Sequence, residues 1–174
     1  MDPMRAGPIR NSYWLAEGEL LAGGYPGSSD PATARQNLEA IVDAGIRSFI
    51  DLTEPHEVPP YDRWLADIAR DKNVDLSYER LRIRNLDVPT LELMDTILDT
   101  IRAQVAAGRP VYVHCWGGIG RTGTVAGCWL VDQGHACDVA FERIRMLRAH
   151  TPEAWKESPE TEDQRAFVRD WRKT

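Results

Sequence analysis

The amino-acid sequence predicts an α/β fold, a sandwich in which helices flank a central and mostly parallel β-sheet. Two observations predict it. Short segments rich in β-branched and aromatic residues, such as PVYVH at residues 110–114, alternate with longer segments whose apolar residues recur at helical spacing. The 174 residues also contain no internal repeat and no low-complexity stretch. We therefore expect a single domain over residues 1–174, with residues 1–12 as an N-terminal tail.

In the first third of the chain, turn and capping residues separate the predicted elements. Asp30 and Pro31 supply an N-cap and a first-turn proline for a helix, and Gly45 ends it. Residues 46–52 (IRSFIDL) then read as a buried strand. Residues 53–60 (TEPHEVPP) are broken by prolines and predict a loop.

The middle of the chain carries the clearest helix. A shorter helix over residues 61–72 and a strand around residues 76–83 (LSYERLRI) precede it. The long helix begins at Pro89 and ends at Gly108. Its apolar stripe consists of Met94, Ile97, Leu98, Ile101 and Val105.

Two further helices follow the strand at residues 110–114. One runs over about residues 121–133 and ends at Gly134, and Asp138 can cap the next, whose apolar residues are Phe141, Ile144 and Leu147. Residues 151–160 (TPEAWKESPE) predict a loop. The last helix holds Phe167, Val168 and Trp171.

Composition and charge argue against several classes of protein. Hydrophobic residues at 43% and charged residues at 28% are typical of a soluble globular protein. The net charge of −6 disfavours a general binder of nucleic acid or anionic membranes. No apolar run approaches the roughly 20 residues of a membrane span, and the opening MDPMRAGPIR lacks the apolar centre of a signal peptide. We therefore expect a cytoplasmic protein with no membrane span and no nucleic-acid partner.

The cysteines and histidines do not form a recognisable disulfide or metal pattern. Cys115, Cys128 and Cys137 are an odd set without framework spacing, which favours reduced thiols. There is no Cys-x-x-Cys pair, and the four histidines are scattered. The sequence therefore predicts no zinc site.

The stretch VYVHCWGGIGRTG, residues 111–123, combines a lone cysteine with glycines and an arginine between a strand and a helix. Consecutive backbone N–H groups in such a turn can form an anion-binding nest, to which the helix N-terminus adds positive potential. Arg121 offers a planar fork that matches two phosphoryl oxygens. The same donors stabilise a thiolate at Cys115. The glycines that allow this close approach are Gly117, Gly118 and Gly120.

Residues 114–123, HCWGGIGRTG, resemble the His-Cys-x5-Arg-Ser/Thr signature of the cysteine-dependent protein tyrosine and dual-specificity phosphatases. The small size and the order of acid loop, long helix, strand and signature are most similar to the dual-specificity branch. The resemblance extends more loosely over residues 15–150, including ELLAGGYPG and FIDLTE, and implies a three-layer sandwich. A rhodanese-type loop is the weaker alternative, because that loop usually has one residue fewer between cysteine and arginine.

The resemblance also implies roles for the residues of the signature. Cys115 would attack phosphorus and form a cysteinyl-phosphate, while Arg121 and the loop amides would hold the equatorial oxygens. Thr122 would donate its hydroxyl to the departing sulfur, and His114 would support the loop from beneath. No metal or other cofactor is required. The substrate-binding residues would be Trp116, Gly117, Gly118, Ile119, Gly120 and Arg121.

Asp87 in NLDVPT, residues 85–90, is the candidate general acid for the leaving oxygen. It follows a strand and precedes the long helix, a position that resembles the acid loop of the family. The alternative is a solvated aspartate that caps the helix. Asp51 and Asp95 are poorer candidates, because the first ends a strand and the second lies within a helix.

Two further features each allow two interpretations. Arg80, Arg82 and Arg84 alternate on one face of the predicted strand, where they either line a substrate edge or form a solvated face paired with glutamates. Gln164 either matches the glutamine that orients water in the family or lies on a helix surface.

The sequence thus predicts a phosphatase domain that dephosphorylates phosphoproteins at phosphotyrosine and at phosphoserine or phosphothreonine, or that hydrolyses a small phosphomonoester. One alternative keeps the chemistry but takes an inositol phosphate or a phosphoinositide; the neutral residues 116–120 disfavour such polyanions. Another is an inactive phosphate-binding module, against which Cys115, Arg121 and Thr122 argue. The oligomeric state is left open.

Overall fold

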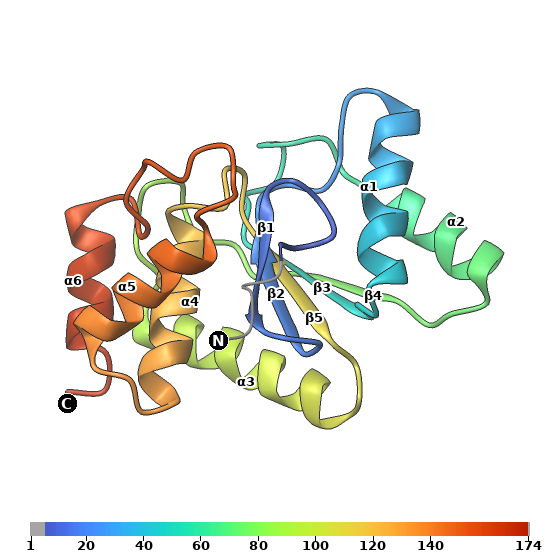
Figure 1. The fold of residues 1–174 in the computed structure, drawn as a ribbon. Helices are drawn as coiled ribbons and strands as arrows, with labels where there is room; N and C mark the ends of the chain where they lie inside the picture. The colour runs from blue at the N-terminus through green and yellow to red at the C-terminus, as the bar shows by residue number, and fades with distance from the viewer. Residues whose placement is uncertain (1–5, 174) are drawn as a thin grey trace.

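The computed structural model describes residues 6–173, in which a five-stranded sheet lies between two layers of helices (Figure 1). The sheet has the strand order β1-β2-β5-β3-β4, with β1 antiparallel to β2 and the other pairings parallel. This confirms the mostly parallel sheet. The strands are β1 (Ser12–Ala16), β2 (Leu20–Gly23), β3 (Ser48–Asp51), β4 (Ser77–Arg80) and β5 (Val111–His114).

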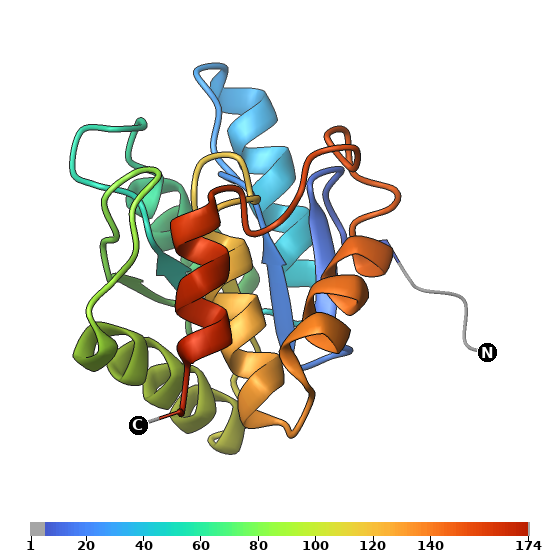
Figure 2. The same cartoon turned by 90° about the vertical axis from the view of Figure 1, so that its left-hand side faces the viewer.

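The helices divide between the two faces of the sheet, which confirms the three-layer sandwich (Figures 1 and 2). One face is covered by α1 (Pro31–Asp43) and α2 (Asp62–Lys72). The other is covered by α3 (Leu91–Ala106), α4 (Arg121–Asp132), α5 (Cys137–Leu147) and α6 (Glu162–Asp170). Within residues 6–173, none of these helices has the length and apolar character needed to cross a membrane.

Side chains of the central strand β5 alternate between the two hydrophobic cores, as the two-residue period of a strand requires. Val111 and Val113 are buried in the core beneath α3 and α4, whereas Tyr112 is buried on the opposite face with residues of α1 and α2. Because β5 is buried on both faces, the position of its carboxyl end is fixed. The three cysteines are free, and Cys128 lies in the first of these cores.

Two of the predicted helix starts can be compared with the caps in the structure. Asp30 caps α1 as expected, accepting a hydrogen bond from Thr33 N at 2.9 Å. The prediction that Asp138 caps the next helix is wrong, because α5 begins at Cys137 with Ala136 as N-cap. Asp138 is already inside the first turn, where its carboxylate accepts a hydrogen bond from Val139 N at 3.0 Å and complements the helix dipole.

The strand predicted around residues 76–83 is shorter than expected. β4 ends at Arg80, opposite Asp51, because the neighbouring strand β3 ends there. Arg82 and Arg84 follow the strand and are exposed. The prediction that Arg80, Arg82 and Arg84 alternate on one strand face is therefore wrong.

The N-terminal segment is only partly described. Residues 1–5, which belong to the predicted tail and to the opening MDPMRAGPIR, lie outside the described residues. From residue 6 onward the chain is tied to β1: Ala6 forms a β-bridge with Tyr13, and Gly7 N donates to Ser12 O at 3.2 Å.

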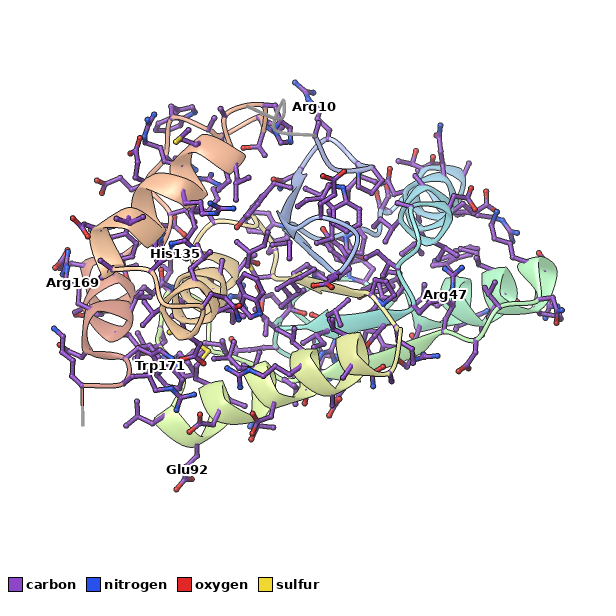
Figure 3. All side chains as sticks on the ribbon, turned by 60° about the horizontal axis from the view of Figure 1, so that its bottom comes forward. Arg10, Arg47, Glu92, His135, Arg169 and Trp171 are labelled. Carbon is purple, nitrogen blue, oxygen red and sulfur yellow. The ribbon has the colours of Figure 1, made fainter. Side chains whose placement is uncertain are left out.

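Helix α6 packs against α4 and brings its first turn to the carboxyl end of the sheet. Val168 is fully buried against Gly127 of α4, and the indole N–H of Trp171 donates to Asp132 at 2.9 Å. Figure 3 shows Trp171 at the carboxyl end of α6 and Arg169 on the outer side of that helix. The contacts with α4 therefore fix the position of α6.

Candidate active site

The candidate site lies at the carboxyl end of the central strand β5, where open α/β sheets bind their ligands. The signature loop (residues 115–121) joins β5 to α4 there. The acid loop (residues 85–90) and the α5–α6 loop (residues 148–161) lie at the same end of the sheet, and Figures 1 and 2 show the three in gold, yellow-green and orange-red. Segments distant in sequence therefore meet around Cys115.

The sulfur of Cys115 lies at the base of the signature loop, where the side chain is 3% exposed. Gly118 N donates to Sγ at 3.3 Å, and Thr122 Oγ1 lies 3.1 Å from it. The single hydroxyl proton of Thr122 has a second acceptor in Gly23 O, at 3.0 Å. Both neighbours of the sulfur are donors, which suits a sulfur that carries negative charge.

Gly118 has to be a glycine. Its φ is +73°, and a Cβ atom would lie 2.6 Å from the carbonyl carbon of Gly23 and 2.7 Å from Gly24 N. Both atoms are backbone at the end of β2, so they cannot give way as a side chain could. The signature loop thus rests directly on the sheet.

Hydrogen bonds from other segments hold the carbonyl groups of the signature loop away from its centre. Trp116 O accepts from Tyr25 N at 2.9 Å, Gly117 O from Asn11 Nδ2 at 3.0 Å, and Ile119 O from Ser158 Oγ at 2.6 Å. With these carbonyls engaged outside, N–H groups are left for the inside of the loop, as an anion-binding nest requires.

Arg121 is held as a fixed fork at the side of the loop. Its guanidinium is 2% exposed and pairs with both carboxylate oxygens of Glu57, Nη1 with Oε2 at 2.9 Å and Nη2 with Oε1 at 2.5 Å. Nη1 also donates to Ile83 O at 3.1 Å. The hydrogen bond with Arg121 holds the pKa of Glu57 below its usual value. No hydrogen bond within residues 6–173 engages Nε, so one edge of the fork is available to an oxyanion.

His114 lies beneath the loop in a buried polar network. Its Nδ1 is 2.9 Å from Cys115 O, which can only accept, so Nδ1 carries the proton and Nε2 accepts from the hydroxyl of Tyr61 at 2.6 Å. Burial lowers the pKa of His114, which favours the neutral imidazole. The carboxylate of Asp51 lies 4.0 Å from Nε2, accepts hydrogen bonds from Thr53 and is 1% exposed. Asp51 therefore belongs to the support of the loop.

A cavity of about 130 Å³ opens above the sulfur. From the signature loop it is lined by Cys115, Trp116, Gly117, Ile119, Gly120 and Arg121. Gly118 does not line it, because its backbone faces Sγ and β2. The other lining residues come from the acid loop (Asn85, Leu86), the α5–α6 loop (Glu153, Lys156, Glu160) and α6 (Gln164).

Asp87 is anchored through its backbone while its side chain is exposed. The backbone N–H donates to Arg84 O at 3.1 Å, the carbonyl accepts from Gln164 Nε2 at 3.2 Å, and Oδ1 accepts from Val88 N at 2.8 Å. Its carboxylate does not line the cavity in this structure. The interpretation of Asp87 as a helix cap is wrong, because Thr90 is the N-cap of α3.

Of the other predicted residues, only some lie at the cavity. Gln164 is fully buried and lines the cavity, so the helix-surface interpretation is wrong. Arg80 lies 3.4 Å from Asp51, whereas Arg82 and Arg84 are exposed and do not line the cavity. Asp95 forms an ion pair with Arg172 at 2.9 Å on α3.

Sequence reasoning missed four charged residues of the site, which are Glu57, Glu153, Lys156 and Glu160. Glu57 stands in the proline-rich loop after β3, and a carboxylate just beyond the carboxyl end of a strand was a usable signal. Lys156, from the α5–α6 loop, lines the cavity and lies 2.5 Å from Glu153. No local pattern placed it there, since its position depends on how that loop folds back.

Comparison with known proteins decides the family. A sequence model of the DSP-PTPase phosphatases of polymorphic toxin systems (Tc-R-P) matches residues 23–135. The chain belongs to this family. It is therefore a phosphatase of the cysteine-based tyrosine and dual-specificity superfamily, which confirms the resemblance of residues 114–123.

Individual relatives of this DSP-PTPase phosphatase are more distant. The uncharacterized protein MJECL20 of Methanocaldococcus jannaschii is 35% identical over 111 residues, which are 64% of this chain and 69% of that protein. The rat phosphatidylglycerophosphatase and protein-tyrosine phosphatase 1 is 29% identical over 146 residues, 81% of this chain and 69% of that protein. Among solved structures, kinase associated phosphatase with its catalytic-site cysteine replaced by serine has a TM-score of 0.70 to this chain. The two are 16% identical, and the match covers 97% of this chain and 96% of that one. This similarity supports the fold.

Proposed function

We propose that this phosphatase hydrolyses phosphomonoesters through a cysteinyl-phosphate on Cys115, and that its substrates are phosphorylated proteins. The observation that supports the chemistry best is the setting of the sulfur. Cys115 Sγ receives donors from Gly118 and Thr122 at the bottom of a cavity that Arg121 also lines. A buried nucleophile that faces fixed donors matches the needs of phosphoryl transfer.

In the first step, the thiolate of Cys115 attacks phosphorus, the S–P bond forms, and the ester P–O bond breaks. The leaving oxygen takes a proton from Asp87. The open edge of Arg121 and the loop N–H groups bind the equatorial oxygens, where negative charge collects in the transition state.

In the second step, water attacks phosphorus, the S–P bond breaks, and inorganic phosphate leaves. The carboxylate of Asp87 accepts a proton from the water, which restores the acid for the next turnover. The hydroxyl of Thr122 lies 3.1 Å from the sulfur and stabilises the departing thiolate. Every charged group used in these steps is a side chain of the protein.

The mouth of the cavity favours an aromatic leaving group. Trp116 is 65% exposed and Leu86 is 54% exposed, and both line the cavity. Exposed apolar side chains at the mouth of a small polar pocket can pack against the ring of a phosphotyrosine. The central residues of the signature loop, 116–120, carry no charge that would select a polyanion. These features support a phosphotyrosine side chain as substrate.

A phospholipid or inositol phosphate is the second candidate. Lys156 brings a second cation to the cavity beside Arg121, and the rat relative is named as a phosphatidylglycerophosphatase as well as a protein-tyrosine phosphatase. The carboxylate of Glu153 lies 2.5 Å from Lys156 and offsets its charge. Because Glu153 offsets the charge of Lys156, we favour a phosphoprotein over a phospholipid or inositol phosphate as the substrate.

The chemistry is tested with Cys115→Ser. A serine hydroxyl is not ionised at neutral pH, so hydrolysis of p-nitrophenyl phosphate should fall at least about 10³-fold. Phosphorylated ligands should still bind, because Arg121 and the loop amides remain. Cys137→Ser, at the partly buried start of α5, is the control and should keep wild-type turnover. Turnover near the wild-type rate in Cys115→Ser would refute the nucleophile.

The wild type should also remain active in excess EDTA and be inhibited competitively by vanadate. Activity that requires an added divalent metal would contradict the mechanism.

The acid is tested with Asp87→Asn. Proton donation is typically worth about 10²–10⁴-fold and matters most for poor leaving groups. Turnover of phosphotyrosine peptides should therefore fall by roughly that range, p-nitrophenyl phosphate should lose considerably less, and the basic limb of the pH profile should flatten. Glu160→Gln is the control, since Glu160 is a carboxylate that lines the cavity. If Glu160→Gln gives this leaving-group pattern and Asp87→Asn does not, the acid is Glu160.

The substrate class is tested by trapping. Cys115→Ser should retain phosphotyrosine peptides more tightly than phosphatidylglycerophosphate or phosphoinositide vesicles. Preferential retention of the vesicles, together with faster wild-type turnover of those lipids, would replace the protein substrate by the lipid one.

A further inference from the structure

Gln164 occupies an unusual position between the loops of the site. It is the third residue of α6, its side chain is 0% exposed, and it lines the cavity above Cys115. A Cβ atom on Gly120 would lie 3.0 Å from both ends of the Gln164 amide. The amide therefore packs directly against the signature loop.

Within residues 6–173, the Gln164 side chain forms its hydrogen bonds with three backbone groups. Its Oε1 accepts hydrogen bonds from Glu160 N at 3.0 Å and from Thr161 N at 3.1 Å, while Nε2 donates to Asp87 O at 3.2 Å. The partners also fix the orientation of the amide, because two N–H donors face one end and a carbonyl acceptor faces the other. One side chain thus connects the start of α6 to the acid loop.

This network leaves little of the amide for a water molecule. An amide oxygen has two lone pairs, and both are used by Glu160 N and Thr161 N. A glutamine that orients an attacking water has to accept a proton from it, and Oε1 has no acceptor capacity left. The one remaining group is the second N–H of Nε2, which can only donate.

We propose that Gln164 is a positioning residue for Asp87 and does not orient the attacking water. By holding the Asp87 carbonyl, it fixes the acid loop over the cavity, so that the exposed carboxylate stays within reach of the leaving oxygen. This inference rests on the proposed function, because it requires Asp87 to protonate that oxygen.

The two roles predict different kinetics. A positioning residue acts in the step that expels the leaving group, so its loss slows poor leaving groups most and changes little once Asp87 is gone. A water-orienting residue acts on the cysteinyl-phosphate, so its loss slows all substrates to a common rate and produces a burst of released alcohol.

The test uses Gln164→Glu and Gln164→Met. Glutamate keeps the capping box with Thr161, so α6 should still form, but it loses the donor to Asp87 O. Methionine is a neutral isostere that controls for the added charge. We expect kcat/KM for phenyl phosphate to fall about tenfold more than for p-nitrophenyl phosphate in both variants, with a weakened basic limb.

A double-mutant cycle completes the experiment. Gln164→Met combined with Asp87→Asn should be no more than about twofold slower than Asp87→Asn alone. Thr161→Ala, which weakens the α6 cap but leaves the bond to Asp87, should keep the wild-type dependence on the leaving group. Two results would overturn the proposal. One is an equal decrease in kcat for all substrates together with a burst of released alcohol. The other is a double variant whose losses in kcat/KM are the product of the losses in the two single variants. Failure of the proposed function itself would appear separately, as turnover that persists in Cys115→Ser.

Discussion

Glu57 is the residue that gives Arg121 its fixed orientation. The two guanidinium nitrogens that pair with Glu57 form one edge of the fork, and the Nε edge is left for the oxyanion. Removing one partner of a buried ion pair leaves an uncompensated charge and frees the side chain to move. In the proposed mechanism the carboxylate would act on the reaction through the position of Arg121, since misplacement of about 1 Å can cost about 10²-fold in rate.

We predict that Glu57→Ala lowers kcat/KM about 10- to 100-fold and weakens inhibition by vanadate to a similar extent. The lost stabilisation belongs to the transition state, which vanadate mimics. Steady-state kinetics with p-nitrophenyl phosphate and a vanadate titration check this.

Glu54→Gln is the matched control for charge. Glu54 is close enough to favour the cationic form of Arg121, but no hydrogen bond joins the two side chains. Glu54→Gln removes a negative charge near the guanidinium of Arg121, but Arg121 stays paired with Glu57. The effect on kcat/KM should therefore stay within about threefold. Equal losses in both variants would show that Glu57 acts through its charge alone.

At the scale of elements, the α5–α6 loop forms one wall of the cavity, and a buried arginine holds it. Arg148, at the end of α5, is 2% exposed and donates to Lys156 O at 3.0 Å and to Glu153 O at 3.1 Å. Both residues line the cavity. The fork of Arg148 therefore fixes the turn that brings Lys156 to the site.

We predict that Arg148→Met loosens this wall without unfolding the sheet. Losing the guanidinium leaves Lys156 O without its donor, whereas Glu153 O still accepts from Lys156 N at 3.0 Å. A carbonyl group left unsatisfied costs about 1–3 kcal/mol when it is buried. Trypsin cleavage after Lys156 should become roughly tenfold faster, because local opening of about 1.4 kcal/mol corresponds to that factor. Mass spectrometry of a digestion time course measures it.

Arg145→Met is the control on the same helix. Arg145 pairs with Glu142 on the exposed face, and surface ion pairs contribute little. Cleavage after Lys156 should remain at the wild-type rate. Equal acceleration in both variants would mean that the loss of any arginine on α5 weakens the loop.

Local patterns in the sequence predicted the helices and the strands β3, β4 and β5, but neither β1 nor β2 and none of the contacts between loops. The apolar stripe predicted α3, and the strand, glycine turn and helix around Cys115 predicted the signature loop. The boundary of α5 was missed because Asp138 and Ala136 are near neighbours and only the backbone geometry distinguishes them. The bond from Gln164 to Asp87 spans 77 positions, and the pair of Arg121 and Glu57 spans 64, so no local period encodes either.

At the scale of the whole molecule, the signature loop and the sheet are joined by the buried network of His114, Tyr61 and Asp51. Burial by itself disfavours the ionised form of Asp51, but the neighbouring His114 and the hydrogen bonds from Thr53 and Tyr78 outweigh it and lower its pKa. Burial also lowers the pKa of His114, which the nearby Asp51 opposes without reversing. The folded state therefore favours a neutral imidazole, and this links the stability of the whole domain to pH.

We predict that the domain loses stability as the pH falls below about 6.5, the ordinary value for histidine. The folded-state pKa of His114 is depressed, so below that pH the unfolded chain binds a proton that the folded chain excludes. The contribution is fully present above pH 6.5 and is lost on acidification, with a slope of at most about 1.4 kcal/mol per pH unit. Urea unfolding at pH 7.5 and at pH 5.5 should show a decrease of up to about 1.4 kcal/mol in the free energy of unfolding. His56→Asn, at an exposed position with φ of 68° that asparagine tolerates, should show the same decrease as the wild type.

An NMR titration of His114 gives the direct check, because its imidazole should stay neutral in the folded protein at pH 6. If His114 instead takes up its proton above pH 6.5 and the stability rises from pH 7.5 to pH 5.5, the buried imidazole is cationic and the loop is supported by an ion pair with Asp51.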